Sequence, residues 1–147
     1  MVNLKLPEII RNYLALPLLL AMVATSAHAE VVVIVSAKSP VTRLTAEQTA
    51  RIFLGKSTGF PGDGEAFPID QMEGSSMRDE FYAKVVHKNS TQLSAYWAKV
   101  IFTGDGRPPV ELESNVAVRR AVAKDRNTIG YIDKRYANRS VRVILEP

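Results

Sequence analysis

One short stretch of the chain carries residue types that can bind an anion. Gly74, Ser75, Ser76 and Arg78 occur together, directly after a short apolar segment that ends at Gln71. Glycine permits a positive φ and serine is a common N-cap residue, so the stretch predicts a tight turn that leads into a helix. Hydroxyls and unpaired N–H groups at the positive end of a helix dipole suit an oxyanion. A simpler interpretation, in which Ser75 or Ser76 only caps the helix, stays open.

Catalysis is a poor fit to the remaining polar residues. His87 is the one histidine after residue 29, and a histidine without partners makes neither a metal site nor a catalytic triad. Asp79 and Glu80 are adjacent in a predicted helix, so they point in different directions and cannot work as a paired acid and base. Residues 104–106 are glycine-rich but lack the flanking strand and helix of a phosphate loop. We therefore expect a protein that is not an enzyme, with no metal and no cofactor.

The N-terminal segment has the three parts of a signal peptide. Lys5 and Arg11 form a basic region, residues 14–24 are apolar, and residues 27–29 read Ala-His-Ala, a small-x-small cleavage site. The apolar run is short for a membrane span. We expect residues 1–29 to be a signal peptide and residues 30–147 to be the mature periplasmic protein, with no stable membrane insertion after cleavage. An uncleaved N-terminal anchor is the alternative.

Composition and charge narrow the class of partner. The chain has 147 residues, of which 46% are hydrophobic, and no cysteine. This composition fits one globular domain that is stabilised by its core and not by disulfides. Residues 107–147 hold nine Lys or Arg against five Asp or Glu, which suits small anions, anionic lipid or cell-wall polymers, or is simply a solvated basic face. Nucleic acid is not expected, because the basic residues are scattered and Tyr131 and Tyr136 alone lie among them.

Strand and helix patterns alternate along the mature chain. The β-branched run Val31 to Val35 predicts a strand that is buried on both faces. Capping-box spacing at Thr45 predicts a helix that extends to Leu54, and residues 57–65 are predicted to form a loop. Further strands are predicted at residues 66–70, 110–112, 128–132 and 141–145. This alternation predicts a single-domain α/β fold, with a mixed sheet flanked by helices.

Three further helices are predicted between these strands. Apolar residues at helical spacing define their inner faces: Met77, Phe81 and Val85 in the first; Leu93, Trp97, Val100 and Ile101 in the second; Val118, Ala121 and Val122 in the third. Asn89 with Ser90 begins the second of these helices, and Ser114 caps the third.

Three short motifs resemble the phosphate-binding proteins of ABC importers, members of the PBP-like family. Residues 52–56 (Ile-Phe-Leu-Gly-Lys) resemble the helix-ending FxGK of that family, and residues 128–131 (Thr-Ile-Gly-Tyr) resemble its IGY segment. Residues 74–76 stand where the family has a Ser-Gly-Thr turn at a helix N-terminus. The motifs occur in the family's order, and they correspond to about one of the two lobes of a full member. The resemblance implies a fold like one lobe of a type II periplasmic binding protein.

The resemblance also implies a ligand and a site. The family binds phosphate with an Arg shortly before the turn, and this chain has Gln71 at that position. The turn's Gly and Thr correspond to Ser76 and Met77. We expect phosphate or a similar oxyanion to bind at six residues: Gly74, Ser75, Ser76, Gln71, Arg78 and, from the loop after the first strand, Ser39. Implied partners are an ABC transporter or another periplasmic protein, and a homodimer would supply the second surface that one lobe lacks. The alternative is a non-catalytic protein-interaction module on the same scaffold with a decayed anion site.

Overall fold

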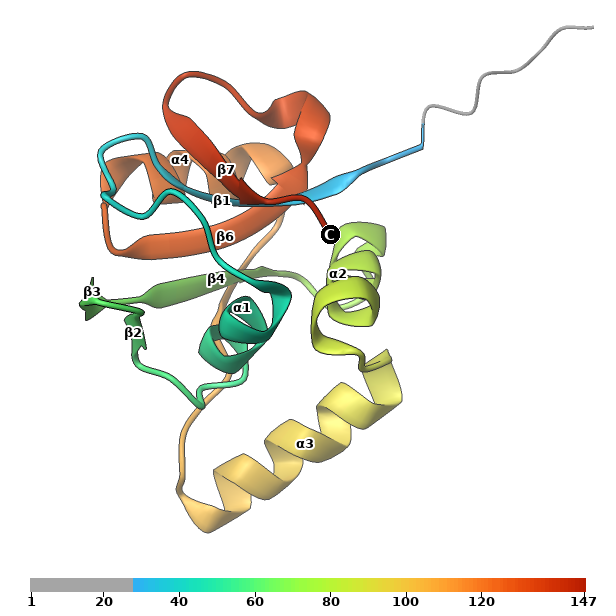
Figure 1. Cartoon of the computed structure of the whole chain (residues 1–147). Helices are drawn as coiled ribbons and strands as arrows, with labels where there is room; N and C mark the ends of the chain where they lie inside the picture. The colour runs from blue at the N-terminus through green and yellow to red at the C-terminus, as the bar shows by residue number, and fades with distance from the viewer. Residues whose placement is uncertain (1–27) are drawn as a thin grey trace, which may run out of the picture.

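A computed structural model of the protein describes residues 28–147. It has a five-stranded sheet with helices on both faces, and a separate two-stranded hairpin (Figure 1). In chain order, the elements are β1 (Val31–Ser36), α1 (Ala46–Phe53), β2 (Gly59–Phe60), β3 (Asp63–Glu65), β4 (Phe67–Gln71), α2 (Ser76–Phe81), the π-helical turn η2 (Tyr82–Val86), α3 (Ser90–Thr103), β5 (Val110–Leu112), α4 (Asn115–Lys124), β6 (Thr128–Asp133), the 3₁₀ turn η3 (Lys134–Tyr136) and β7 (Val141–Leu145). The predicted signal peptide falls almost wholly on residues 1–27, outside the described residues, and stays a prediction.

Strand directions decide which loops meet. The strand order is β5-β4-β6-β1-β7, and β4 runs parallel to both β5 and β6. β1 runs antiparallel to β6 and β7. The carboxyl ends of β4, β5 and β6 therefore lie at one end of the sheet, and the loop that follows β1 leaves from the opposite end. The predicted α/β fold with a mixed sheet flanked by helices is confirmed.

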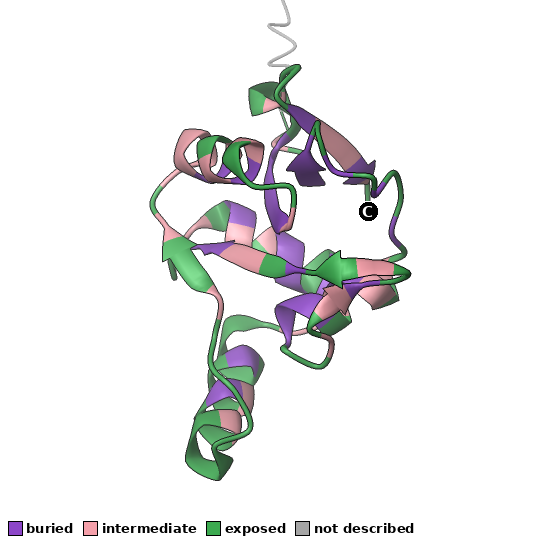
Figure 2. Ribbon diagram, turned by 90° about the vertical axis from the view of Figure 1, so that its left-hand side faces the viewer, coloured by how far each residue is buried: buried purple, intermediate pink, exposed green. Residues whose placement is uncertain are grey.

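β1 is buried on both faces, as its β-branched run predicts. Val31, Val33 and Val35 pack in a core cluster that includes residues of α1 and α2. Val32 and Ile34 pack on the other face, in a cluster that includes residues of α4. Figure 2 shows buried segments, in purple, on the strands and on parts of the helices. The sheet is thus the middle layer of three. Because it is packed on both faces, the positions of the strand ends and of the polar residues on them are well defined.

Gly130 allows α4 to pack closely on β6. A Cβ atom at this position would lie 2.7 Å from Cγ1 of Val118 and 3.1 Å from Cγ2 of Val122. Both distances are shorter than ordinary carbon contacts, so any larger residue would push the helix away from the sheet. The glycine of the IGY-like segment therefore has a packing role in this chain.

Two parts of the fold differ from the sequence-based prediction. The predicted loop 57–65 contains the hairpin β2–β3. Ile101, predicted on the buried stripe of α3, is 57% exposed. The reason is that α3 extends away from the body (Figure 1) and buries Leu93 and Trp97 but not its C-terminal turns. Among residues 28–147, no helix is long and apolar enough to cross a membrane.

Candidate functional site

The predicted turn lies between β4 and α2, at the end of the sheet where β4, β5 and β6 finish. We call residues 72–77, which comprise this turn and the first two residues of α2, the α2 turn. The N–H of Met72 donates to the carbonyl of Leu112 at 3.2 Å, and the N–H of Ser75 donates to the carbonyl of Met72 at 3.1 Å. Gly74 has a φ of +87°, which a residue with a side chain rarely adopts. The backbone geometry of the turn therefore explains the glycine at position 74.

Ser75 is the N-cap of α2. Its hydroxyl oxygen accepts from the N–H of Arg78 at 3.4 Å, and its hydroxyl donates to Oε1 of Gln71 at 3.1 Å. The hydroxyl of Ser75 therefore already donates to and accepts from groups of the protein itself. Ser76 is the first residue of the helix and is exposed. The N–H groups of Ser76 and Met77 have no acceptor within the helix, because the first turn of a helix leaves its donors unpaired.

Gln71 is buried and braces the turn. Its Nε2 donates to Oδ1 of Asn115 at 2.9 Å and to the carbonyl of Tyr131 at 3.2 Å. Together with the bond from Ser75, these contacts use both Nε2 protons and one lone pair of Oε1. Asn115 continues the network by accepting from the N–H of Asp133 at 3.0 Å. Gln71 thus connects the α2 turn to the start of α4 and the end of β6.

A buried carboxylate, Asp70, lies beneath the turn. The hydroxyl of Tyr82 donates to Oδ2 at 2.7 Å, the N–H of Gln71 donates to Oδ1 at 2.9 Å, and the hydroxyl of Tyr131 also donates to Oδ1. Burial raises the pKa of Asp70, and the tyrosine hydroxyls oppose this shift by stabilising the charged form. Burial and the Asp70 charge raise the pKa of both tyrosines well above the ordinary range, so their hydroxyls remain donors.

The ring of Tyr131 is held by aromatic packing. It stacks on Phe81 with 4.0 Å between ring centroids and 5° between planes, and Phe53 packs against both rings. Because Phe81 ends α2 and Tyr131 lies on β6, this contact places the Tyr131 hydroxyl under the turn.

Arg78 is paired with carboxylates and does not extend into solvent. Its Nη1 donates to the carbonyl of Gln71 at 2.8 Å, forms a close ion pair with Glu111, and lies 3.8 Å from Oδ2 of Asp70. Burial works against the charged guanidinium, but the hydrogen bond to Glu111 and the charge of Asp70 outweigh it and raise the pKa of Arg78. The positive charge at the turn is therefore already balanced by this protein's own acids.

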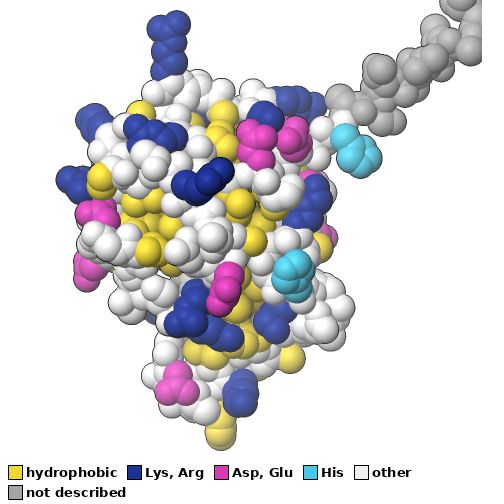
Figure 3. All heavy atoms as spheres, viewed as in Figure 1, with side chains coloured by type: hydrophobic (Ala, Val, Ile, Leu, Met, Phe, Trp, Pro, Cys, Tyr) yellow, Lys and Arg dark blue, Asp and Glu magenta, His cyan; other side chains and the backbone are white. Residues whose placement is uncertain are grey.

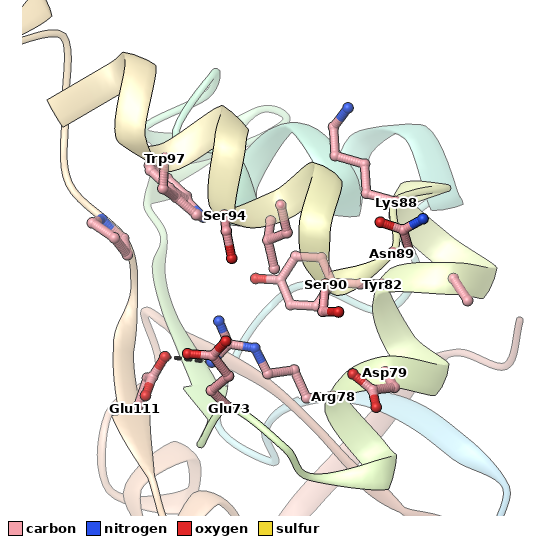
Figure 4. Close-up of a pocket in the computed structure, with 13 residues that line it drawn as sticks. Glu73, Arg78, Asp79, Tyr82, Lys88, Asn89, Ser90, Ser94, Trp97 and Glu111 are labelled. Atoms are coloured by element: carbon pink, nitrogen blue, oxygen red, sulfur yellow. Dashed lines mark hydrogen bonds and ion pairs between the residues drawn. The ribbon is translucent and has the colours of Figure 1, made fainter. Parts of the chain in front are cut away.

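A pocket of about 490 Å³ opens beside the turn, between α2, α3 and the start of β5. Figure 4 shows Glu73, Arg78 and Glu111 close together on one side of it, with Trp97 on the other. Its volume is in the range of small-ligand sites. Asp79 adds a further carboxylate to the lining, and Lys88 adds one cation. Carboxylates still outnumber unpaired cations there, so this pocket is a poor place for a multiply charged anion. The unpaired donors at the start of α2 are the feature of this region that best suits an anion.

The structure does not bring Ser39 to the other predicted residues. Ser39 follows β1 at the opposite end of the sheet from the α2 turn. Its hydroxyl oxygen accepts from the N–H of Val41 at 3.2 Å, and its carbonyl accepts from Arg142 at 2.6 Å. The physical reason is strand direction: β1 is antiparallel to β6, while β4 is parallel to it, so the loops after β1 and β4 leave from opposite ends.

Several residues around the turn were not predicted as site residues, although Tyr131 belongs to the IGY-like segment. Asp70, Tyr82, Tyr131 and Asn115 come from four separate elements, and pairing between them depends on the register of β4 and β6. In the part of the chain that the structure describes, no group of three or more His, Cys, Asp or Glu residues could hold a metal ion.

No family model and no curated protein matches the chain, but solved structures do. One from Clostridium perfringens, assigned as a phosphate ABC transporter substrate-binding protein and containing bound phosphate, shares 23% identity at a TM-score of 0.59, over 78% of this chain and 44% of that protein. An ABC-type phosphate transport receptor from Vibrio cholerae shares 20% identity at a TM-score of 0.62, over 78% and 45%. PstS from Borrelia burgdorferi shares 17% identity at a TM-score of 0.60, over 78% and 46%.

The chain therefore matches less than half the length of each of these proteins. Identities of this size support a common fold and do not transfer a ligand. They confirm the resemblance derived from the three motifs: the chain has the fold of about one lobe of a phosphate ABC transporter substrate-binding protein.

Proposed function

We propose that this chain is an exported, non-catalytic solute-binding-like protein that binds phosphate or a similar oxyanion at the α2 turn. The observation that carries the proposal is the start of α2, where Ser76 is exposed and the N–H groups of Ser76 and Met77 have no acceptor within the helix, directly after the positive-φ residue Gly74. The fold supports it, because one of the solved structures with this fold contains phosphate. An ABC transporter is the partner that the fold suggests, with the periplasm as the location.

Within this proposal the predicted residues have two roles. Gly74 and Ser76 contact the anion, with the N–H of Met77. Gln71 and Ser75 position the turn, since their side chains bond to each other and to neighbouring elements. Arg78 uses Nη1 to bond to Gln71 and Glu111. It contributes to anion binding through its other N–H groups.

Affinity of the chain on its own is expected to be low. Donors on one open surface compete with water, and the nearby Asp70 and Glu111 carboxylates repel an anion. We expect a dissociation constant for phosphate on the order of 0.1 mM or weaker. Tight binding requires a second surface that closes over the turn, from a protein partner or another copy of the chain.

Isothermal titration with phosphate, combined with urea unfolding, tests the division of roles. Ser76→Ala removes a hydrogen bond to a charged ligand, worth about 1.5–3 kcal/mol, so affinity should fall about tenfold or more while stability is unchanged. Ser75→Ala removes a helix cap and should lower stability by about 1 kcal/mol.

Ser90 provides a matched control, because it is the first residue of α3, just as Ser76 is the first residue of α2. Ser90→Ala should leave the affinity for phosphate unchanged. If the unmodified chain gives no binding heat with phosphate at millimolar concentrations, the oxyanion proposal is wrong, and the interaction module becomes the better hypothesis.

A further inference from the structure

Five cations meet at the end of the sheet opposite the α2 turn. We call this surface the basic end; its residues are Lys38, Arg120, Lys124, Arg139 and Arg142. Two hydrogen bonds bring their segments together: the N–H of Ala37 donates to the carbonyl of Ser140 at 3.0 Å, and the hydroxyl of Ser36 donates to the carbonyl of Ala123 at 3.3 Å. The loop after β1, the C-terminal turn of α4 and the start of β7 thus share one surface.

The charges of the basic end are not neutralised by the protein itself. Among residues 28–147, none of the five takes part in an ion pair. Arg142 donates to the carbonyls of Ala37, Ser39 and Val41, which keep its charge in place without cancelling it. Two acids lie nearby: Asp125 accepts from the N–H of Asn127, and Asp63 is paired with Arg126 at 3.7 Å. Figure 3 shows Lys and Arg side chains gathered on the upper left of the molecule, over the same region.

The pocket at the opposite end of the sheet contains more carboxylates than unpaired cations, with Lys88 as its one cation outside the Arg78 ion pair. Glu73, Asp79 and Glu111 line the pocket beside the α2 turn, where Arg78 is already paired. The strand directions that separate Ser39 from this turn also separate the two sets of charges. Unpaired cations are therefore concentrated at the basic end, and carboxylates are concentrated around the pocket at the other end, so the basic end is the one that suits an anionic surface.

We propose that the basic end docks the protein on an anionic lipid surface. A flat surface can contact cations from three separate segments at the same time, whereas a small anion needs donors that converge in a concave site. None of the five side chains lines the pocket beside α2 or the four other pockets found among residues 28–147. A linear anionic polymer has the same charge as an anionic membrane, so the test below includes a soluble polyanion as a separate outcome.

Docking in this way has a consequence for the α2 turn. With the basic end on the lipid, the turn and its neighbouring pocket point away from the membrane and stay open to solvent and to partners. The inference does not rest on oxyanion binding, because it uses residues at the other end of the sheet.

Vesicle co-sedimentation of the purified full-length protein tests the proposal. Vesicles of equimolar phosphatidylglycerol and phosphatidylcholine are compared with vesicles of phosphatidylcholine alone, at low and at physiological ionic strength. The test variant combines Lys38→Glu, Lys124→Glu and Arg139→Glu, three exposed side chains with no hydrogen bonds or ion pairs of their own among residues 28–147. The matched control combines Arg51→Glu, Lys99→Glu and Arg107→Glu, which changes the net charge equally at exposed positions on α1, α3 and the loop before β5.

We expect binding to anionic vesicles that weakens with salt. Each cation near an anionic surface contributes roughly fivefold, so loss of the three positive charges alone weakens binding on the order of 100-fold, and the charge-reversed test variant should bind more weakly still. The control should change binding less than about threefold, because charges beyond a Debye length are screened. A neutral version with Gln at the three test positions should fall between them, and it serves as the test if the Glu variant does not fold.

Four results would overturn the proposal: no binding to anionic vesicles at low salt, equal binding to neutral vesicles, equal losses in the test and control variants, or capture by soluble polyphosphate without capture by vesicles. The last result would assign the basic end to an anionic polymer. Any membrane affinity of the N-terminal apolar residues is common to all variants and does not affect their comparison.

Discussion

Removing the hydroxyl of Tyr131 perturbs the buried cluster under the α2 turn with little change in shape. Tyr131→Phe keeps the ring that stacks on Phe81 and leaves no large cavity. It removes a donor to Oδ1 of Asp70 and an acceptor for the N–H of Gln71 at 3.1 Å. Asp70 would keep two donors, the hydroxyl of Tyr82 and the N–H of Gln71.

The cost follows from the charge of Asp70. A hydrogen bond to a charged group contributes about 1.5–3 kcal/mol, so we expect a loss of about 2 kcal/mol in the free energy of unfolding at neutral pH. For a folded region of roughly 120 residues, an unfolding entropy of about 2.1 cal/mol/K per residue converts this loss to a fall of about 8 °C in Tm.

The loss should depend on pH. Burial raises the pKa of Asp70 above its ordinary value of 3.8, and the tyrosine donors hold it down. A carboxyl whose pKa is raised by folding contributes most stability below its unfolded pKa, and the contribution is lost as pH rises through the folded pKa. Without Tyr131 the pKa rises further, so the deficit of the variant should be small below pH 3.8 and grow to its full size towards neutral pH.

Urea unfolding at a series of pH values measures this deficit, with the slope of the unfolding curve as a check on two-state behaviour. Tyr136→Phe is the control, since Tyr136 is 40% exposed and its hydroxyl makes no hydrogen bond within residues 28–147. Its stability should stay within about 0.5 kcal/mol of the unmodified chain. A Tyr131→Phe deficit that is equal at acidic and neutral pH would refute the charged-acceptor account of Asp70.

Two further predictions concern the packing of α4 and the N-terminus. Gly130→Ala should destabilise the fold by about 1–3 kcal/mol, because its Cβ would lie 2.7 Å from Cγ1 of Val118. Gly64→Ala is the control, since a Cβ there would meet open space and should be tolerated. Urea unfolding compares the two variants, and equal losses of stability would contradict the close-packing role of Gly130. Intact-mass measurement of the exported protein should give a chain that begins at Glu30; a species that retains residues 14–24 would mean an anchored protein instead.

Most of the fold could be predicted from local sequence patterns. The β-branched run of β1 predicts burial on both faces, and the Thr45–Gln48 capping box forms with both of its hydrogen bonds. Ser114 caps α4 as its position indicates. These features depend on neighbouring residues, so one sequence is enough to find them. The exposure of Ile101 could not be predicted, because helical spacing identifies an apolar face but not whether another element covers it.

The candidate site could be predicted only in part. The turn and its serine cap follow from local residue types, and the structure contains both. Gln71 bonds to Asn115 and Tyr131, and Arg78 bonds to Glu111. These partners are far apart in the chain, so local sequence patterns do not reveal them. Ser39 was predicted to contribute because it follows a strand, but strand direction decides which loops meet, and that is a property of the whole sheet.

Phosphate titration followed by NMR tests the central claim most directly, because it reports which amides respond. Assigned ¹H–¹⁵N spectra of the chain should show saturable shifts at the amides of Gly74, Ser76 and Met77, with a midpoint on the order of 0.1 mM or weaker. The amide of Ser39, at the other end of the sheet, should not move. Spectra in which the α2 turn is unchanged, or in which the largest shifts surround Lys38 and Arg139, would contradict an oxyanion site at the start of α2.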